Sequence, residues 1–287
     1  MGEKLTLLKP KIDVVFHALF REGNEKITKA MIQAATKEKI QKVNLDNDKH
    51  LVGKYPEEKL GIVDLKATLD NGTICDIEIQ LADNKDTAER FLFYWSRIYA
   101  GQLVKGDDYG KLNKVIGIII IDYELEKTKE VQKLSTKWKI REVSTGKQIE
   151  LTDVFELYII EIPKARRILK EEPKNELAQW VMFINDPNES EVSKIMEDNK
   201  EIKEAMNELE KISKDKELRR VAELREKAIR DEKNGLRHAK EEGIKEGIKE
   251  GIEQVAKRML ELNIPIQDII KTTGLQEKQI LELKKNV

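Results

Sequence analysis

The sequence has few of the residues that build zinc sites and disulfides. Cys75 is the only cysteine, which excludes internal disulfides and cysteine-rich zinc sites. The three histidines, His17, His50 and His238, are far apart and have no paired spacing that would place two of them on one helix face as metal ligands. We therefore expect no zinc site.

Long apolar runs and an excess of one charge are also lacking. The longest apolar run, Val115 to Ile121, is far shorter than the roughly 20 residues that span a bilayer, and no secretory leader opens the sequence. We expect no membrane partner and a cytoplasmic location. The net charge is -1, so any contact with nucleic acid must come from local patches. With 287 residues, 39% of them hydrophobic, the chain can form one good-sized core plus an appendage.

Residues 61–80 predict two strands joined by a hairpin, because apolar and polar residues alternate on both sides of Asn71-Gly72. Asn and Gly both tolerate the positive φ angles of a tight type I′ turn. The hairpin would bring Asp64 level with the segment from 76 to 80.

The second strand of this hairpin has one polar and one apolar face. Asp76, Glu78 and Gln80 share a face, whereas Ile77 and Ile79 point to the other, since side chains alternate along a strand. Two interpretations stay open. The acidic face either meets solvent, as in an ordinary antiparallel strand, or carries chemistry.

Two short helices are expected before the hairpin. Apolar residues at helical spacing over 12–20 predict the first, with Asp13 and His17 four residues apart on one neighbouring face. The second is expected around 27–35, after a break at residues 21–24.

A longer helix is expected after the hairpin. Apolar residues over 88–103 follow the helical period for about four turns, and Gly106 ends the pattern. Arg90, Arg97 and Gln102 lie on its less apolar sides.

Two buried strands are expected next. Val115 to Ile121 is rich in β-branched residues without alternation, which predicts a strand that is covered on both faces at the sheet centre. A further strand is expected over 154–162, and Pro163 closes it.

The segment from Asn175 to about Leu262 shows no alternation and mixes charges of both signs, which predicts a helical arm. Gly243, Gly247 and Gly251 recur at every fourth residue in it. Relative to alanine, three glycines cost a helix about 2 to 3 kcal/mol. Close approach of another helix would account for them, and a frayed joint between two domains is the alternative.

The last segment, 264–283, predicts two short helices joined by a tight turn at 272–274. A DNA-reading helix-turn-helix unit and a plain hairpin that caps the arm both fit, although the second helix balances Lys against Glu. We thus expect three parts: residues 1–172, an arm over 173–262, and a C-terminal unit over 263–287.

With Asp13 in a first helix, Asp64 on one strand and Glu78-Ile79-Gln80 on the next, the order resembles the core of PD-(D/E)xK nucleases. It is most similar to the recombination-promoting nuclease and putative transposase family of that superfamily. The stretches that carry the resemblance are 13–20, Asp64, 77–80, 90–109 and the Glu-Gly-Ile repeat that leads into 273–275.

The resemblance implies an α/β fold with a restriction-endonuclease-like α-β-β-β-α-β core, a central mixed sheet and a long α-helical C-terminal arm. It also implies a DNA endonuclease that uses Mg²⁺, with Mn²⁺ as a substitute, in recombination or on mobile elements. The usual lysine two residues after the second acid is Gln80 here, as is common in the transposase-like branch. Lys66 could bring an ammonium to the site instead. His17 stands where the family often has lysine.

Under this resemblance Asp64 and Glu78 hold the ion, with the carbonyl oxygen of Ile79 as an extra ligand. Asp13 would hold the site from outside or bind a second ion. Gln80 would orient the attacking water without a positive field, so slow turnover is expected.

Candidates for contacts to DNA phosphates are Arg90, Arg97, Gln102 and Lys66, although the charged side chains could equally be solvated. Two other classes stay open. One is a nuclease fold that binds DNA or a partner without cutting, and the other is a homo-oligomeric interaction protein assembled through the arm. The presence of both Asp64 and Glu78 favours the enzyme.

Overall fold

The computed structural model describes residues 5–45, 65–83 and 86–284, and the chain divides into two compact units, Met1–Ile229 and Arg230–Val287. The first unit contains a six-stranded mixed sheet with the order β1-β2-β3-β4-β6-β5. β3 is parallel to β4 and β4 to β6, whereas the other neighbours are antiparallel. The strands are β1 (Val43–Leu45), β2 (Leu65–Leu69), β3 (Ile74–Gln80), β4 (Val115–Ile121), β5 (Ser135–Trp138) and β6 (Phe155–Glu161).

The predicted α/β class and mixed central sheet are confirmed. β4 is buried along its whole length between β3 and β6, as its β-branched composition without alternation predicts. β1 supplies the first of the three strands that precede α3 in the chain, and β5 forms one edge of the sheet. Neither of these short strands has enough alternation to be found from the sequence.

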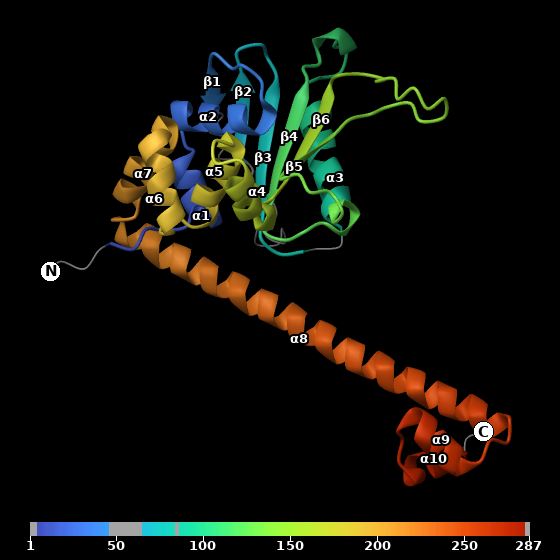
Figure 1. The fold of residues 1–287 in the computed structure, drawn as a ribbon. Helices are drawn as coiled ribbons and strands as arrows, with labels where there is room; N and C mark the ends of the chain where they lie inside the picture. Colours follow the sequence, from blue (N-terminus) through green and yellow to red (C-terminus); the bar gives the residue numbers. More distant parts are fainter. Residues whose placement is uncertain (1–4, 46–64, 84–85, 285–287) are drawn as a thin grey trace. The chain divides into compact units, whose positions relative to one another are not determined.

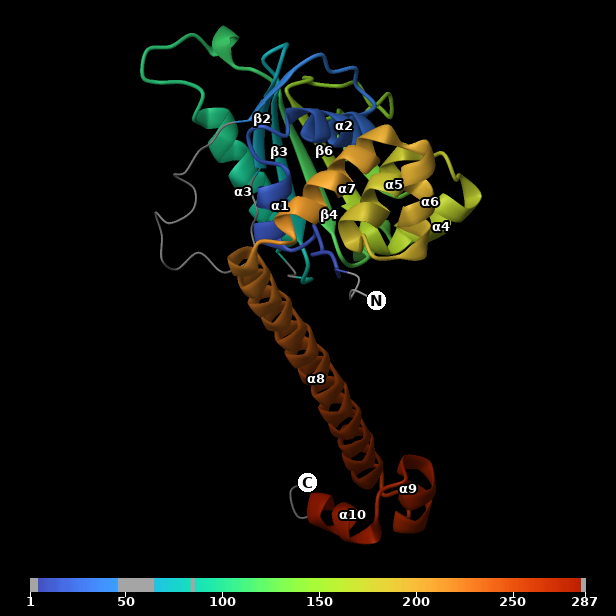
Figure 2. The same cartoon turned by 90° about the vertical axis from the view of Figure 1, so that its left-hand side faces the viewer.

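Helices cover both faces of the sheet (Figures 1 and 2). The larger hydrophobic cluster joins one face to α1, α2, α5 and α7, and a smaller cluster joins the other face to α3. The helices of this unit are α1 (Asp13–Leu19), α2 (Glu25–Thr36), α3 (Thr87–Ala100), α4 (Ala165–Glu171), α5 (Glu176–Asn185), α6 (Ser190–Asp198), α7 (Lys200–Ile212) and the first part of α8 (Lys216–Glu261).

Gly117 in β4 allows α3 to approach the sheet closely. A Cβ atom at this position would lie 2.0 Å from the ring of Phe91, so only glycine leaves room for that ring. Phe91 is fully buried and anchors α3 over the face of the sheet that carries Asp76, Glu78 and Gln80.

The hairpin between β2 and β3 exists, but its turn differs from the predicted type I′ turn. Only Gly72 has a positive φ (82°), and Leu69 N–H donates to Thr73 O at 2.8 Å, which leaves a three-residue loop. Asn71 keeps a negative φ and accepts a hydrogen bond from Thr73 N at 3.0 Å. The loop therefore resembles a type I turn with a glycine bulge, which also suits the twist of a hairpin.

The first unit extends beyond the predicted boundary at residue 172. α5 is apolar around nearly its whole circumference, and its side chains lie in the core with those of α1 and α2. α7 adds a buried stripe that includes Ile202, Met206 and Leu209. Charges of both signs on the exposed side of α7 led to the prediction of a solvated arm, because the sequence alone does not show that its apolar stripe is buried.

The second unit contains the rest of α8 with α9 (Ile266–Thr273) and α10 (Glu277–Lys284), as predicted for two short helices. Ala256, Ile269 and Ile280 form its small buried cluster, and Gly274 ends α9 with a φ of 71°. α8 continues through the glycine repeat, so no frayed joint occurs there. Of the described helices, none combines the length and apolarity needed to cross a membrane.

Candidate active site

The polar face of β3 is buried rather than solvent-exposed. Asp76, Glu78 and Gln80 are only 2%, 6% and 8% exposed. They pair in parallel register with Gly117, Ile119 and Ile121 of β4, on the face that α3 covers. The interpretation as an ordinary half-exposed strand is therefore wrong. Buried carboxyl groups cost free energy of folding, so their presence along β3 makes this face the candidate site.

Asp64, the first acid of the predicted pair, lies outside the described residues. In the sequence it directly precedes Leu65, which pairs with Ile77 across β2 and β3. Its place beside Glu78 and its role as a metal ligand stay predictions.

Lys66 lies on the acidic face. It pairs directly with Asp76 across the antiparallel β2–β3 ladder, and opposite residues in such a ladder point to the same side of the sheet. Its side chain is partly buried. The register thus brings one lysine to the face that carries Glu78 and Gln80.

Gln80 is held by hydrogen bonds at the end of β3. Its Nε2 donates to Ala82 O and to Thr87 Oγ1, both at 3.2 Å. Thr87, the first residue of α3, is 2.8 Å from the hydroxyl of Tyr123, which follows β4. Sequence reasoning missed Thr87 and Tyr123, because no pattern in the chain reveals a contact between three separate elements.

Tyr123 remains a phenol over the working range of most enzymes. Burial is the main cause that raises its pKa to about 12, with Asp83 and Asp86 adding to the rise and the hydrogen bond to Thr87 and the charge of Arg90 opposing it. The influence of Arg90 on this pKa shows that the guanidinium of Arg90, in α3, lies near the hydrogen bonds that join Gln80, Thr87 and Tyr123.

Asp13 begins α1, as predicted, and its Oδ2 is 3.4 Å from Nε of Arg225 in α8. Its other oxygen, Oδ1, is buried without a hydrogen-bond partner among the described residues. His17 lies one turn later, where burial lowers its pKa in spite of the negative charge of Asp13. A role for Asp13 near a metal ion stays a prediction.

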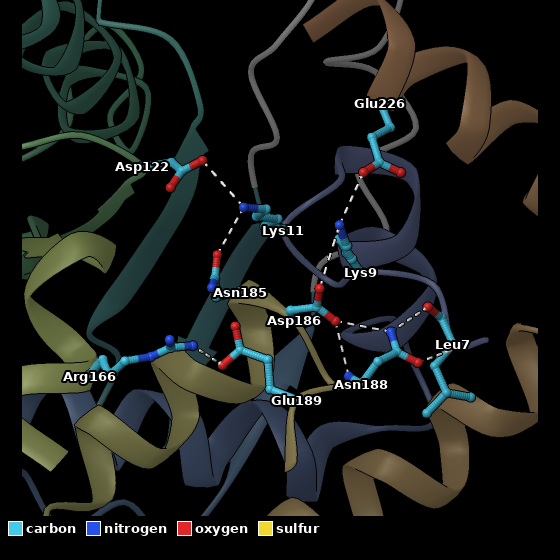
Figure 3. A network of polar contacts seen from close by, with 10 residues as sticks. All are labelled: Leu7, Lys9, Lys11, Asp122, Arg166, Asn185, Asp186, Asn188, Glu189 and Glu226. Atoms are coloured by element: carbon cyan, nitrogen blue, oxygen red, sulfur yellow. Dashed lines mark hydrogen bonds and ion pairs between the residues drawn. The ribbon is translucent and has the colours of Figure 1, made fainter. Parts of the chain in front are cut away.

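The segment before α1 is tied to the same end of the sheet as Gln80. Lys11 Nζ is 3.3 Å from Asp122 Oδ2 and 2.8 Å from Asn185 Oδ1 (Figure 3). The backbone N–H of Asp122 donates to Gln80 O at 3.0 Å. Only Ile12 separates Lys11 from Asp13 in the sequence, so the start of α1 is anchored where β3 and β4 end.

Two of the four predicted phosphate contacts, Arg97 and Gln102, differ in their surroundings. Arg97 is exposed and lies over the ring of Phe93, with 5.8 Å between its guanidinium carbon and the ring centroid. Gln102 instead holds the loop after α3, since it donates to Asn113 O at 3.1 Å and accepts from Asn113 N at 2.8 Å. These bonds favour a structural role for Gln102. The helix itself ends at Ala100, before the predicted Gly106.

The described part of the site offers oxygen donors for a hard divalent ion. Glu78 brings a carboxylate, Gln80 an amide oxygen, and Ile79 a backbone carbonyl, and such ligands suit Mg²⁺ or Mn²⁺. Within the described ranges, no group of three or more His, Cys, Asp and Glu side chains is arranged to hold a metal ion. These donor types fit a hard divalent ion. The predicted set of metal ligands also requires Asp64.

Comparison with protein families matches residues 10–239 to a family described as PD-(D/E)XK nuclease family transposase. No match was found among curated proteins or among solved structures.

Proposed function

Because this chain belongs to the PD-(D/E)XK nuclease family transposases, we propose that it is a metal-dependent DNA endonuclease that acts in recombination or on mobile elements. The observation that carries the proposal is the buried acidic face of β3, with Glu78 and Gln80 beside Lys66. A strand that only builds a sheet has no reason to bury this face under α3, because burial of carboxyl groups opposes folding.

In the proposed site Asp64 and Glu78 hold a divalent ion, with the carbonyl oxygen of Ile79 as a further ligand. When bound, Mg²⁺ or Mn²⁺ neutralises phosphate charge, lowers the pKa of coordinated water and stabilises the leaving oxygen. Gln80 orients the attacking water, and Lys66 adds positive charge near the phosphate. Asp13 supports the site from α1.

The absence of lysine at position 80 predicts slow turnover. An amide cannot supply the positive field that an ammonium gives to the attacking water and to the phosphate. Arg90 and Arg97 of α3 are proposed to bind phosphates of the DNA, which would position the strand without reading its sequence.

Nicking of supercoiled plasmid in Mg²⁺ or Mn²⁺ tests the proposal. Asp64→Asn and Glu78→Gln keep the side-chain shapes but weaken the oxygen ligands, so each is expected to abolish nicking while DNA binding and the circular dichroism spectrum stay unchanged. Glu89→Gln, an exposed acid on α3, is the matched control and should cut like the parent. If the parent cuts no DNA with either ion, or if Asp64→Asn cuts equally well, the proposal is refuted.

Assembly through the arm is a second part of the proposal. A Cβ atom added at Gly243, Gly247 or Gly251 would meet nothing within 4 Å, so the packing of the described chain does not require these glycines. Ile244 and Ile248 beside them are more than half exposed. We propose that this face pairs with a second copy, and that the cytoplasm is the location. If cutting is absent, a DNA-binding or oligomeric protein of the nuclease fold is the alternative.

A further inference from the structure

The orientation of the Gln80 amide follows from its hydrogen bonds. Ala82 O can only accept, so the nitrogen of the amide and not its oxygen must face it, at 3.2 Å. The second proton of the same nitrogen reaches Thr87 Oγ1 at 3.2 Å. Both amide protons are therefore engaged within the protein, and Oε1 is the atom through which Gln80 can act on water or an ion.

Two residues from other elements hold this orientation. Thr87 accepts from Gln80, and its hydroxyl shares a further hydrogen bond of 2.8 Å with Tyr123. Thr87 is 6% exposed at the start of α3, and Phe91, one turn later, is locked against Gly117. The hydroxyl of Thr87 is thus fixed by the packing of α3 on the sheet.

We infer that Thr87 and Tyr123 are positioning residues that hold Gln80 as a hydrogen-bond acceptor in the cleavage site. The inference rests on the proposed nuclease function and adds to it how Gln80 can serve where a lysine is usual. A lysine would donate to the reacting groups, whereas Gln80 held in this way accepts a hydrogen bond from the attacking water or offers its oxygen to the cation.

The first test observes the amide itself. The side-chain NH₂ signals of Gln80 in a ¹⁵N-labelled protein can be assigned by their loss in Gln80→Glu. We expect slow solvent exchange of these protons in the parent and in Thr87→Ser, and faster exchange with shifted signals in Thr87→Val, which keeps the shape but removes the hydroxyl. Tyr123→Phe should give a smaller change of the same kind. Unchanged signals in both Thr87→Val and Tyr123→Phe would overturn the inference.

The second test is kinetic. At saturating DNA, Thr87→Val should slow nicking by about 10-fold with unchanged DNA affinity, and Thr87→Ser should stay within about twofold of the parent. In a Gln80→Ala background, Thr87→Val should cause no further loss, because it acts only through the amide. An equal additional loss in that background contradicts the inference. A parent that never cuts refutes the proposed function instead, whereas the amide signals decide the orientation by themselves.

Discussion

Glu156, near the start of β6, holds a buried charge whose contribution to stability can be measured. Its side chain is 3% exposed, and the ammonium groups of Lys114, Lys137 and Lys139 lie 3.0, 2.8 and 3.0 Å from its oxygens. Burial on its own raises the pKa of this carboxyl, but hydrogen bonds from the three lysines outweigh it and lower the pKa from 4.5 to about 2.

Glu156→Gln preserves the shape of the side chain and removes its charge. Since one pKa unit corresponds to about 1.4 kcal/mol, we expect the unfolding free energy of the first unit to fall by about 3 kcal/mol near pH 7. For a unit of this size such a loss lowers the Tm by about 6 to 12 °C.

The pH dependence gives the sign of the effect. A carboxyl whose pKa is depressed in the folded state stabilises the fold above its unfolded pKa, and this contribution is lost as the pH falls toward its folded pKa. The stability difference between the parent and Glu156→Gln should therefore shrink between pH 4.5 and about 2.

Urea unfolding followed by tryptophan fluorescence measures this quantity for the first unit alone, because Trp95, Trp138 and Trp180 all belong to it. The matched control is Glu150→Gln. Glu150 is 29% exposed and pairs with Lys139 at 2.6 Å, so its loss should cost less than about 1 kcal/mol. Equal losses in the two variants, or a difference for Glu156→Gln that is the same near pH 3 and near pH 7, would refute the reasoning.

Three further outcomes are expected. Lys164→Met should lower the unfolding free energy by about 3 to 5 kcal/mol in urea unfolding, because it leaves the fully buried Glu161 without its ion pair at 2.9 Å. A loss under about 1 kcal/mol would show that the pair is dispensable. Sedimentation should show self-association of the full chain. Gly247→Leu should weaken this association, whereas Gly235→Leu, elsewhere on α8, should leave it unchanged. A monomer at micromolar concentration would contradict the proposed pairing. Deletion of residues 264–287 should change DNA affinity at fixed salt by less than about tenfold, since the charges of this segment balance, and a larger loss with the oligomer intact would identify a DNA-reading element.

The elements with strong periodicity were predictable from the sequence, and the contacts between elements were not. The β-branched composition of β4 without alternation and the alternation of β3 each specify their strand directly. Asn71-Gly72 located the hairpin but not its turn, because the bond from Thr73 N to the Asn71 side chain stabilises a different loop. Such a side-chain bond competes with backbone preference and leaves no periodic signal.

The candidate site shows the same division. Glu78 and Gln80 could be chosen because they alternate with apolar residues on one strand, and Lys66 because its strand pairs with theirs. Thr87 and Tyr123 could not, since they come from α3 and the loop after β4, and their hydrogen bonds to Gln80 and to each other form only after the sheet and helix have packed. Local sequence propensity does not predict contacts between residues of separate elements.

The ties of the N-terminal segment in Figure 3 bear on how the chain folds during its synthesis. Leu7 is held by Asn188 through two hydrogen bonds of 2.9 and 3.0 Å, and Lys9 by Glu226 at 3.1 Å. Ribosomes add about 5 to 20 residues per second, so these partners leave the ribosome on the order of ten seconds or more after the segment that they bind. Asp13, paired with Arg225, reaches its final surroundings only when nearly the whole first unit has been made.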